Sequence, residues 1–222
     1  MINMPQILKA QRDLMGQIAV TFKGDDGKEF ERYFSEMRAG ISWPIRDLPG
    51  YVAILGLFSG AIFGKADSLM LVYEKEYRDS VELITDAYNK ANDLRFRIFY
   101  TNLRHPEWRG YNDDFHRKIR SGLGARDIRL MHSRYENEFS RGKDVINRLA
   151  SENAFHIPSA SLLMTQLRNM KPKHMQTENP EHIFHAVNGF RYLLVQWELE
   201  KDFRRLQAPR EEERRITVKG WA

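Results

Sequence analysis

Two hydrophobic patterns recur along this chain, and they predict different elements. Apolar runs of strand length occur within residues 51–58 and 67–74. Elsewhere, apolar residues recur at spacings of three and four, which is the pattern of a helix with one buried side. The clearest case lies near the C-terminus, where residues 180–203 form the longest predicted helix. Its apolar side consists of Ile183, Val187, Phe190, Leu194 and Trp197.

These patterns, with Gly, Pro, Asn and Asp at the breaks between them, predict an order of elements. We predict strands at residues 17–23, 51–58, 67–74, 94–100, 127–132 and 155–158. We predict helices at residues 7–15, 29–37, 79–92, 113–121, 139–153, 160–170 and 180–203. Two successive strands, followed by strands that alternate with helices, are typical of an α/β fold with a mixed sheet flanked by helices.

The segment 39–50 contains Pro44 and Pro49, and we predict it to be a connector. It divides a short N-terminal α/β arm, residues 1–49, from a main domain at residues 50–203. The last residues, 204–222, mix acidic and basic side chains and have little to bury. We therefore expect them to form a charged tail that a partner could order.

Composition indicates a globular protein. The chain has 222 residues, of which 42% are hydrophobic and 29% charged, enough to fill one core and to cover it with a polar surface. It contains no cysteine, which excludes disulfides, thiolate nucleophiles and cysteine-containing zinc sites. The start has no basic segment leading into an apolar one, and the longest apolar run, 51–63, is too short to span a bilayer. We expect neither export nor membrane insertion.

The net charge of +5 is concentrated between residues 93 and 129, where basic residues stand among aromatic ones. A partner lined with phosphates selects this combination, because cations neutralise phosphate and rings stack on bases. The expected nucleic-acid-binding residues are Arg95, Arg97, Arg104, Arg109, Arg117, Lys118 and Arg120. The alternative is that Arg95 and Arg97 form the outer side of a strand, and that the cations at 117–120 lie on a solvated helix face.

Four short motifs follow one another in an order that resembles a known family. The sequence RDLMG at 12–16 precedes a strand, and GLFSG at 56–60, with Gly64, lies between two strands. KDVINRL at 143–149 is followed by FHIP at 155–158, and HAVNGFRYL occupies 185–193. From about residue 8 to about residue 197, the chain resembles the C-terminal nuclease domain of the large terminase subunit of tailed bacteriophages.

The resemblance implies an RNase H-like fold, in which carboxylates from separate elements hold two divalent cations. It places the first acidic position at Phe58, the second at Asn102 and the third at or near Phe184. Asn188 also replaces the Asp of the family's terminal motif. Because a phenyl ring cannot coordinate a metal ion, we expect no catalytic residues, no metal site and no cofactor. The protein would then be a pseudonuclease.

We therefore expect a non-catalytic, terminase nuclease-like module of a phage or prophage that acts in viral DNA packaging in the host cytoplasm. Its expected partners are double-stranded DNA and the terminase ATPase subunit or the portal. The sequence does not fix an oligomeric state. Gly-Lys-Ser and Gly-Lys-Thr do not occur, so the ATPase of a packaging motor would have to come from elsewhere.

Two alternatives stay open at this point. In the first, the protein is an active endonuclease whose Mg²⁺ or Mn²⁺ ligands are displaced to Asp67, Glu74, Glu76, Asp113 and Asp114. Against it, an Asp at 113–114 can cap a helix while the two glutamates face water. In the second, the protein is an interaction scaffold without DNA binding that docks through residues 204–222. The seven histidines are scattered, which does not favour a zinc site.

Overall fold

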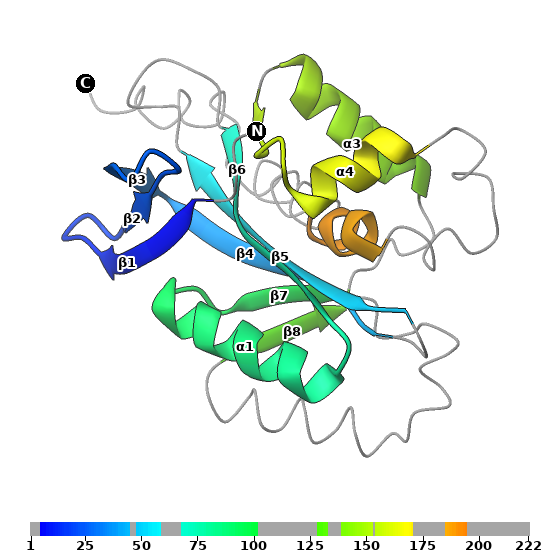
Figure 1. The fold of residues 1–222 in the computed structure, drawn as a ribbon, viewed down its shortest axis with the longest axis horizontal. Helices are drawn as coiled ribbons and strands as arrows, with labels where there is room; N and C mark the ends of the chain where they lie inside the picture. The colour runs from blue at the N-terminus through cyan, green and yellow to red at the C-terminus, as the bar shows by residue number, and fades with distance from the viewer. Residues whose placement is uncertain are drawn as a thin grey trace, which may run out of the picture.

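The computed structural model describes residues 5–44, 48–58, 68–101, 128–132, 139–152, 154–170 and 185–194. A small sheet lies near the N-terminus (Figure 1). Its strands β1 (Gln6–Arg12), β2 (Ile18–Lys23) and β3 (Glu29–Phe34) are antiparallel neighbours in chain order. Ser35 alone separates β3 from the next strand, so the chain passes directly from the small sheet into a larger one.

The larger sheet has six strands in the described part of the chain. They are β4 (Glu36–Ser42), β5 (Gly50–Phe58), β6 (Ser68–Tyr77), β7 (Ile98–Thr101), β8 (Arg129–His132) and β9 (Phe155–His156). Their spatial order is β8-β7-β4-β5-β6-β9. The strands β4, β5 and β6 form an antiparallel meander. Beside β4, the strands β7 and β8 continue the sheet in parallel, and β9 pairs in parallel with β6 at the other end.

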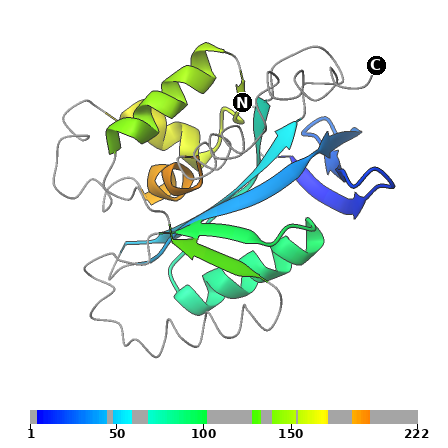
Figure 2. The same ribbon diagram turned by 180° about the vertical axis from the view of Figure 1, so that it is seen from behind.

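Helices cover both faces of the larger sheet (Figures 1 and 2). Helix α1 (Ser80–Asp93) covers one face together with the small sheet, and we call this the α1 face. Helices α3 (Phe139–Ser151) and α4 (Leu162–Asn169) cover the other, with a helical segment at 185–194, and we call this the α4 face. None of the described helices is long and apolar enough to cross a membrane.

Residue alternation along the central strand β4 assigns side chains to the two faces. Met37, Ala39 and Ile41 are buried in the core on the α1 face. Gly40, which alternates with them, faces the segment 185–194 on the other side. Both faces of β4 are therefore covered, as expected for a strand with parallel partners and helices on either side.

The small sheet is attached to the larger one by aromatic packing. Phe22 stacks on Phe30 with ring centroids 5.3 Å apart and meets Phe34 edge to face at 6.5 Å. The ring of Phe34 lies against Gly56 of β5, where an added Cβ would be 2.3 Å from Cδ1 of the ring. A residue with a side chain at position 56 would therefore displace Phe34 from the core.

The structure confirms the mixed α/β class and most predicted elements after residue 50. The predicted strands at 17–23, 51–58, 67–74 and 127–132 correspond to β2, β5, β6 and β8. The predicted strands at 94–100 and 155–158 are shorter, as β7 and β9. The predicted helices at 79–92, 139–153 and 160–170 correspond to α1, α3 and α4. The predicted helix at 113–121, parts of that at 180–203 and the charged tail at 204–222 lie outside the described residues.

Three predictions for the first 50 residues are wrong. The predicted helices at 7–15 and 29–37 are strands, because both segments pair with β2 along its whole length. The predicted connector at 39–50 contains the second half of β4, which lies between β5 and β7. The predicted main domain begins at residue 50. The larger sheet, however, also contains β4, which precedes that residue.

Candidate functional site

The first candidate site lies where three parallel strands end. Ile41, one residue before the end of β4, pairs with Thr101 at the end of β7, and Thr101 pairs with His132 at the end of β8. The last residues of the three strands, Ser42 of β4, Thr101 of β7 and His132 of β8, thus lie along one edge of the sheet, which we call the carboxyl edge. Open sheets of this kind bind ligands beyond the carboxyl ends of their parallel strands. None of the three strands ends on an acidic residue.

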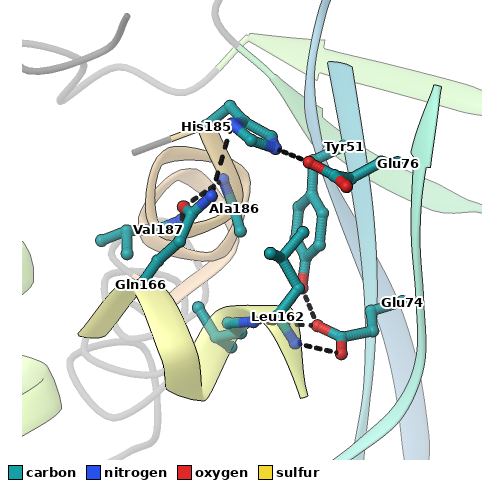
Figure 3. Close-up of polar contacts among 9 residues, drawn as sticks. Tyr51, Glu74, Glu76, Leu162, Gln166, His185, Ala186 and Val187 are labelled. Atoms are coloured by element: carbon teal, nitrogen blue, oxygen red, sulfur yellow. Dashed lines mark hydrogen bonds and ion pairs between the residues drawn. The ribbon is translucent and has the colours of Figure 1, made fainter. Parts of the chain in front are cut away.

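On the α4 face, a row of paired residues crosses the sheet at the level of the carboxyl edge. Ser42 of β4 pairs with Tyr51 of β5, and Tyr51 pairs with Glu76 of β6. Above this row lies His185, whose ring meets that of Tyr51 edge to face with centroids 6.2 Å apart. The phenol of Tyr51, the carboxylate of Glu76 and the imidazole of His185 therefore lie on one side of the sheet (Figure 3).

Both nitrogens of His185 have partners. Its Nε2 lies 2.5 Å from Oε1 of Glu76, and its Nδ1 lies 3.4 Å from Nε2 of Gln166 on α4 (Figure 3). The oxygen of the same Gln166 side chain accepts from the amides of Ala186 at 2.9 Å and Val187 at 3.4 Å. The imidazole is therefore fixed between a strand and a helix, and it cannot accept a proton from a ligand without leaving a partner.

Glu74, two residues before Glu76, holds the start of α4. One carboxylate oxygen accepts from the amide of Leu162 at 2.7 Å, and the other accepts from the amide of Leu163 at 3.1 Å. The second oxygen also accepts from the hydroxyl of Tyr51 at 2.6 Å (Figure 3). Burial, and then the charge of Glu74, raise the pKa of Tyr51 well above its ordinary value, so this phenol stays protonated and keeps donating.

The approach of segment 185–194 to β4 depends on two glycines. A Cβ added at Gly40 would lie 1.9 Å from the carbonyl oxygen of Gly189. A Cβ added at Gly189 would lie 3.2 Å from the amide nitrogen of Ser42 and from Cδ1 of Tyr51. Backbone thus lies on backbone directly below the carboxyl edge, and Asn188 is completely buried beside this crossing.

A partly buried ion pair, in which the arginine is buried and the glutamate is 28% exposed, lies on the same face of β4. Arg38 is 1% exposed, and its Nε donates to Oε1 of Glu36 at 2.7 Å. Its Nη1 donates to the hydroxyl of Tyr100, and its Cζ lies 5.7 Å from the centroid of the same ring. A buried guanidinium needs such partners, because an unpaired one carries the full cost of desolvation. Arg38 thus ties β4 to β7 rather than facing a ligand.

The strand pairing moves Phe58 away from the carboxyl edge. Because β5 runs antiparallel to β4, Phe58 lies beyond Leu57, which pairs with Glu36 at the start of β4. The ends of β4 and β7 are about 20 Å away along the strands. Phe58, to which the resemblance assigns the first acidic position, therefore does not lie at the carboxyl edge, where the last residue of β4 is Ser42. Asn102 and Phe184 lie outside the described residues.

The displaced metal site has only two of its five members among the described residues. Contrary to our expectation, Glu74 does not face water, because its two oxygens bind the start of α4 and Tyr51. Glu76 is 44% exposed but is paired with His185. Asp67, Asp113 and Asp114 lie outside the described residues. Within the described ranges, no three His, Asp or Glu side chains are placed to share a metal ion.

The second candidate site is the basic surface after α1. Arg95 is exposed and has a positive φ of 58°, at the position following the cap of α1, where the amide of Phe96 donates to the carbonyl of Ala91 at 3.1 Å. Glycine is the usual residue at this position of a helix end. Arg97 is half-buried, and its Nη1 donates to the carbonyl of Phe96 at 3.0 Å. The other predicted contacts, Arg104, Arg109, Arg117, Lys118 and Arg120, lie outside the described residues.

Sequence reasoning missed Ser42 and the pairing of Glu76 with His185. Ser42 lay in the predicted connector, so it received no position in a sheet. Glu76 and His185 are 109 residues apart, and no local spacing links them. The strand alternation of Met37, Ala39 and Ile41 was the one signal that could have placed Ser42 on β4.

No protein-family model matches this chain, and no curated protein matches it. Its function therefore has to be inferred from its own residues and their geometry.

Proposed function

We propose that this protein is a non-catalytic, nuclease-like module of the terminase type that binds duplex DNA during the packaging of a phage genome. The RNase H-like assignment is part of the proposal. It is supported by the strand order, because an antiparallel meander of three strands, with two strands added in parallel beside its first strand, is the arrangement of an RNase H-like sheet.

The observation that carries the loss of catalysis is the residue types at the carboxyl edge. A two-metal nuclease needs ionised oxygens there, because hard divalent cations bind carboxylates and stabilise both the attacking and the leaving oxygen. The edge is formed by Ser42, Thr101 and His132, and the residue that follows Thr101 is again not an acid. Among the described residues, the carboxylates of Glu74 and Glu76 on the α4 face are engaged in holding helical segments in place.

The observation that supports DNA binding is the backbone of Arg95. A non-glycine residue in the left-handed region costs roughly 1–2 kcal/mol relative to glycine. Arg95 occupies this conformation with its side chain exposed, at the start of the Arg-rich segment 93–129. Local strain of this kind concentrates at functional positions. An arginine that is kept here in place of the less strained glycine supports a role for its positive charge in binding DNA.

A plasmid assay tests the loss of catalysis. Supercoiled plasmid is incubated with purified protein and Mg²⁺, and separately with Mn²⁺, and the nicked and linear forms are quantified. We expect no conversion above the buffer control. Conversion that persists in the pure protein and is abolished in Glu76→Gln would contradict the proposal and establish the displaced-ligand endonuclease instead.

The substitution Arg95→Gly tests DNA binding and separates it from folding. We expect the variant to be as stable as the wild type or about 1 kcal/mol more stable, because glycine relieves the left-handed backbone. Its affinity for random duplex should fall, and the slope of log K against log salt should decrease by about 1, as for the loss of one phosphate contact.

Lys28→Ala is the matched control. Lys28 is also an exposed cation, with a side chain 84% accessible, on the turn between β2 and β3. Its removal should leave both the affinity and the salt slope unchanged. Binding that does not respond to salt in the wild type, or an Arg95→Gly variant that binds as well as the wild type, would remove Arg95 from the interface.

A further inference from the structure

The turn between β1 and β2 exposes two large apolar side chains to water. Leu14 is fully exposed and Met15 is 84% exposed. Turns are usually built from Gly, Asn, Asp and Pro, each for a conformational reason. Here Asp13 and Gly16 meet those needs, and nothing in the geometry of the turn requires apolar residues between them. The conformation of the turn therefore does not explain why Leu14 and Met15 are apolar, and a binding partner would.

The turn is rigid. One carboxylate oxygen of Asp13 accepts from the amides of Met15 at 2.9 Å and Gln17 at 2.8 Å. The backbone of Asp13 also pairs with Gln17 at 2.9 Å and with Gly16 at 3.1 Å, and Gly16 has a φ of 80°. A preformed tip of this kind loses little conformational entropy when it enters a partner.

A cation, Arg12, lies directly beside this tip. Nη1 of Arg12 donates to the carbonyl of Gly16 at 2.8 Å, and Nη2 donates to the carbonyl of Arg95 at 3.1 Å. One exposed guanidinium therefore joins the hairpin to the place where the Arg-rich segment 93–129 begins. Many proteins that bind the minor groove of DNA insert apolar side chains between two stacked base pairs and contact the DNA beside them through arginines.

We propose that Leu14 and Met15 form a wedge that enters duplex DNA between two base pairs, while Arg12 and Arg95 contact the flanking phosphates. This inference rests on the proposed DNA binding, and it adds that the bound duplex is kinked where the wedge enters. Unstacking one step costs a few kcal/mol, and the wedge offsets this by removing two apolar side chains from water.

A lipid surface is the less favoured partner for the same tip. Burying two such side chains contributes about 3–6 kcal/mol. A single myristoyl chain, at about 0.8 kcal/mol for each CH₂, contributes more and still gives only marginal membrane binding. Arg12 beside the tip also contacts Arg95, and two neighbouring cations favour a partner with a continuous line of phosphates.

Fluorescence energy transfer across a duplex of about 30 base pairs tests the wedge, with a donor dye at one end and an acceptor at the other. A second duplex carries one central mismatch, where unstacking costs less. We expect the wild type to increase transfer and to bind the mismatched duplex roughly fivefold to tenfold more tightly than the matched one. The double variant Leu14→Ser/Met15→Ser should lose both effects and keep the salt dependence of binding.

Val81→Ser is the control, since Val81 is a 59% exposed apolar residue on α1, and it should behave as the wild type. No binding of either duplex by the wild type would defeat the proposed function. Binding without a change in transfer, or with the same change in the double variant, would defeat the wedge alone. Binding to anionic vesicles that requires Leu14 and Met15, without bending of DNA, would assign the tip to a membrane surface instead.

Discussion

The two faces of β6 hold their helices by opposite chemistry. On the α1 face, the strand supplies hydroxyl groups and the helix supplies the carboxylate. Tyr73 donates to Asp86 of α1 at 2.6 Å, and Tyr77 donates to the same oxygen. On the α4 face, the strand supplies the carboxylates of Glu74 and Glu76, and the donors come from backbone amides and an imidazole.

The difference lies in which part of a helix is held. Asp86 is in the middle of α1, whose start is capped within its own sequence by Asp79, which accepts from the amides of residues 81 and 82. On the α4 face, Ser161 caps α4 within its own sequence, but the first two amides of the helix are held by Glu74, and the amides of Ala186 and Val187 are held by Gln166. Carboxylates at a helix start are favourable because the exposed amides and the dipole attract them. The hydrogen bonds that hold the α4 face therefore come in large part from distant residues, and those that hold the α1 face come mainly from near ones.

The largest effect should come from filling the backbone crossing on the α4 face. Gly40→Ala places a methyl group 1.9 Å from the carbonyl oxygen of Gly189, so strand and helix must separate. We expect a loss of about 3 kcal/mol or more in the free energy of unfolding. Gly189→Ala is the matched comparison, because its nearest neighbours are at 3.2 Å and alanine favours a helix, and it should change stability by less than about 1 kcal/mol. Urea unfolding measures the stability of both variants. Equal losses would contradict the close contact between the backbone of Gly40 and the carbonyl of Gly189.

The next largest effect should come from Glu74. Glu74→Ala leaves the amides of Leu162 and Leu163 and the hydroxyl of Tyr51 without their acceptor, which should cost about 2–3 kcal/mol. Glu74→Gln keeps one acceptor oxygen and should cost about half as much. Hydrogen exchange should localise the change to the start of α4 and leave α1 protected. Uniform loss of protection in both helices would show that the two faces are not independent.

The smallest effect should come from the tyrosine pair on the α1 face, and it should depend on pH. Burial opposes ionisation of Asp86, but hydrogen bonds from Tyr73 and Tyr77 and the charges of Lys75 and Lys90 outweigh it, and the pKa of Asp86 lies below its ordinary value of 3.8. The stability that this carboxylate contributes is complete above pH 3.8 and is lost as the pH falls toward the lower folded value.

The double variant Tyr73→Phe/Tyr77→Phe should lose about 1–2 kcal/mol at neutral pH and show a weaker decline in acid. Tyr33→Phe is the matched control, since the hydroxyl of Tyr33 donates to Glu31 on the open surface, and it should cost less than about 0.5 kcal/mol. The urea midpoints of the wild type and both variants, measured from about pH 6 down to about pH 3, test this prediction. An identical acid profile in the double variant and the wild type would exclude Asp86 as its source.

The contrast between the faces also explains what the sequence could predict. Helix α1 has a capping Asp79 and buried residues Leu83, Ala87 and Ala91 at a helical spacing, all within one segment. Such local signals predict an element correctly. Helix α4 also has a local cap, since the hydroxyl of Ser161 accepts from the amide of Met164 at 2.9 Å, but the acceptor of its first two amides is distant, because Glu74 and Leu162 are 88 residues apart. The sequence therefore predicted α4 itself but not the residues that hold its first turn.

The errors near the N-terminus have a similar cause. In β3, Arg32 interrupts the alternation that would have indicated a strand, so Phe30 and Phe34 stand at a helical spacing. In the structure, Cζ of Arg32 lies 5.0 Å from the centroid of the Phe30 ring, and the cation occupies an apolar position without being buried. In β4, two nearby prolines indicated a connector, whereas the strand is completed by partners from both sides. Pairing outweighs local preference in both strands.

The central place of β4 sets an order for folding. Its bonds to β5 close a short loop, whereas its bonds to β7 join Ala39 to Phe99 and must wait until a long stretch of chain has been drawn in. Distant, parallel pairing is slow for this reason. Until β7 arrives, one flank of β4 offers its amides and carbonyls to any extended chain. Before residues 98–101 have been made, the nascent protein would therefore present an unfinished sheet, for which a chaperone or a prompt partner would have the greatest value.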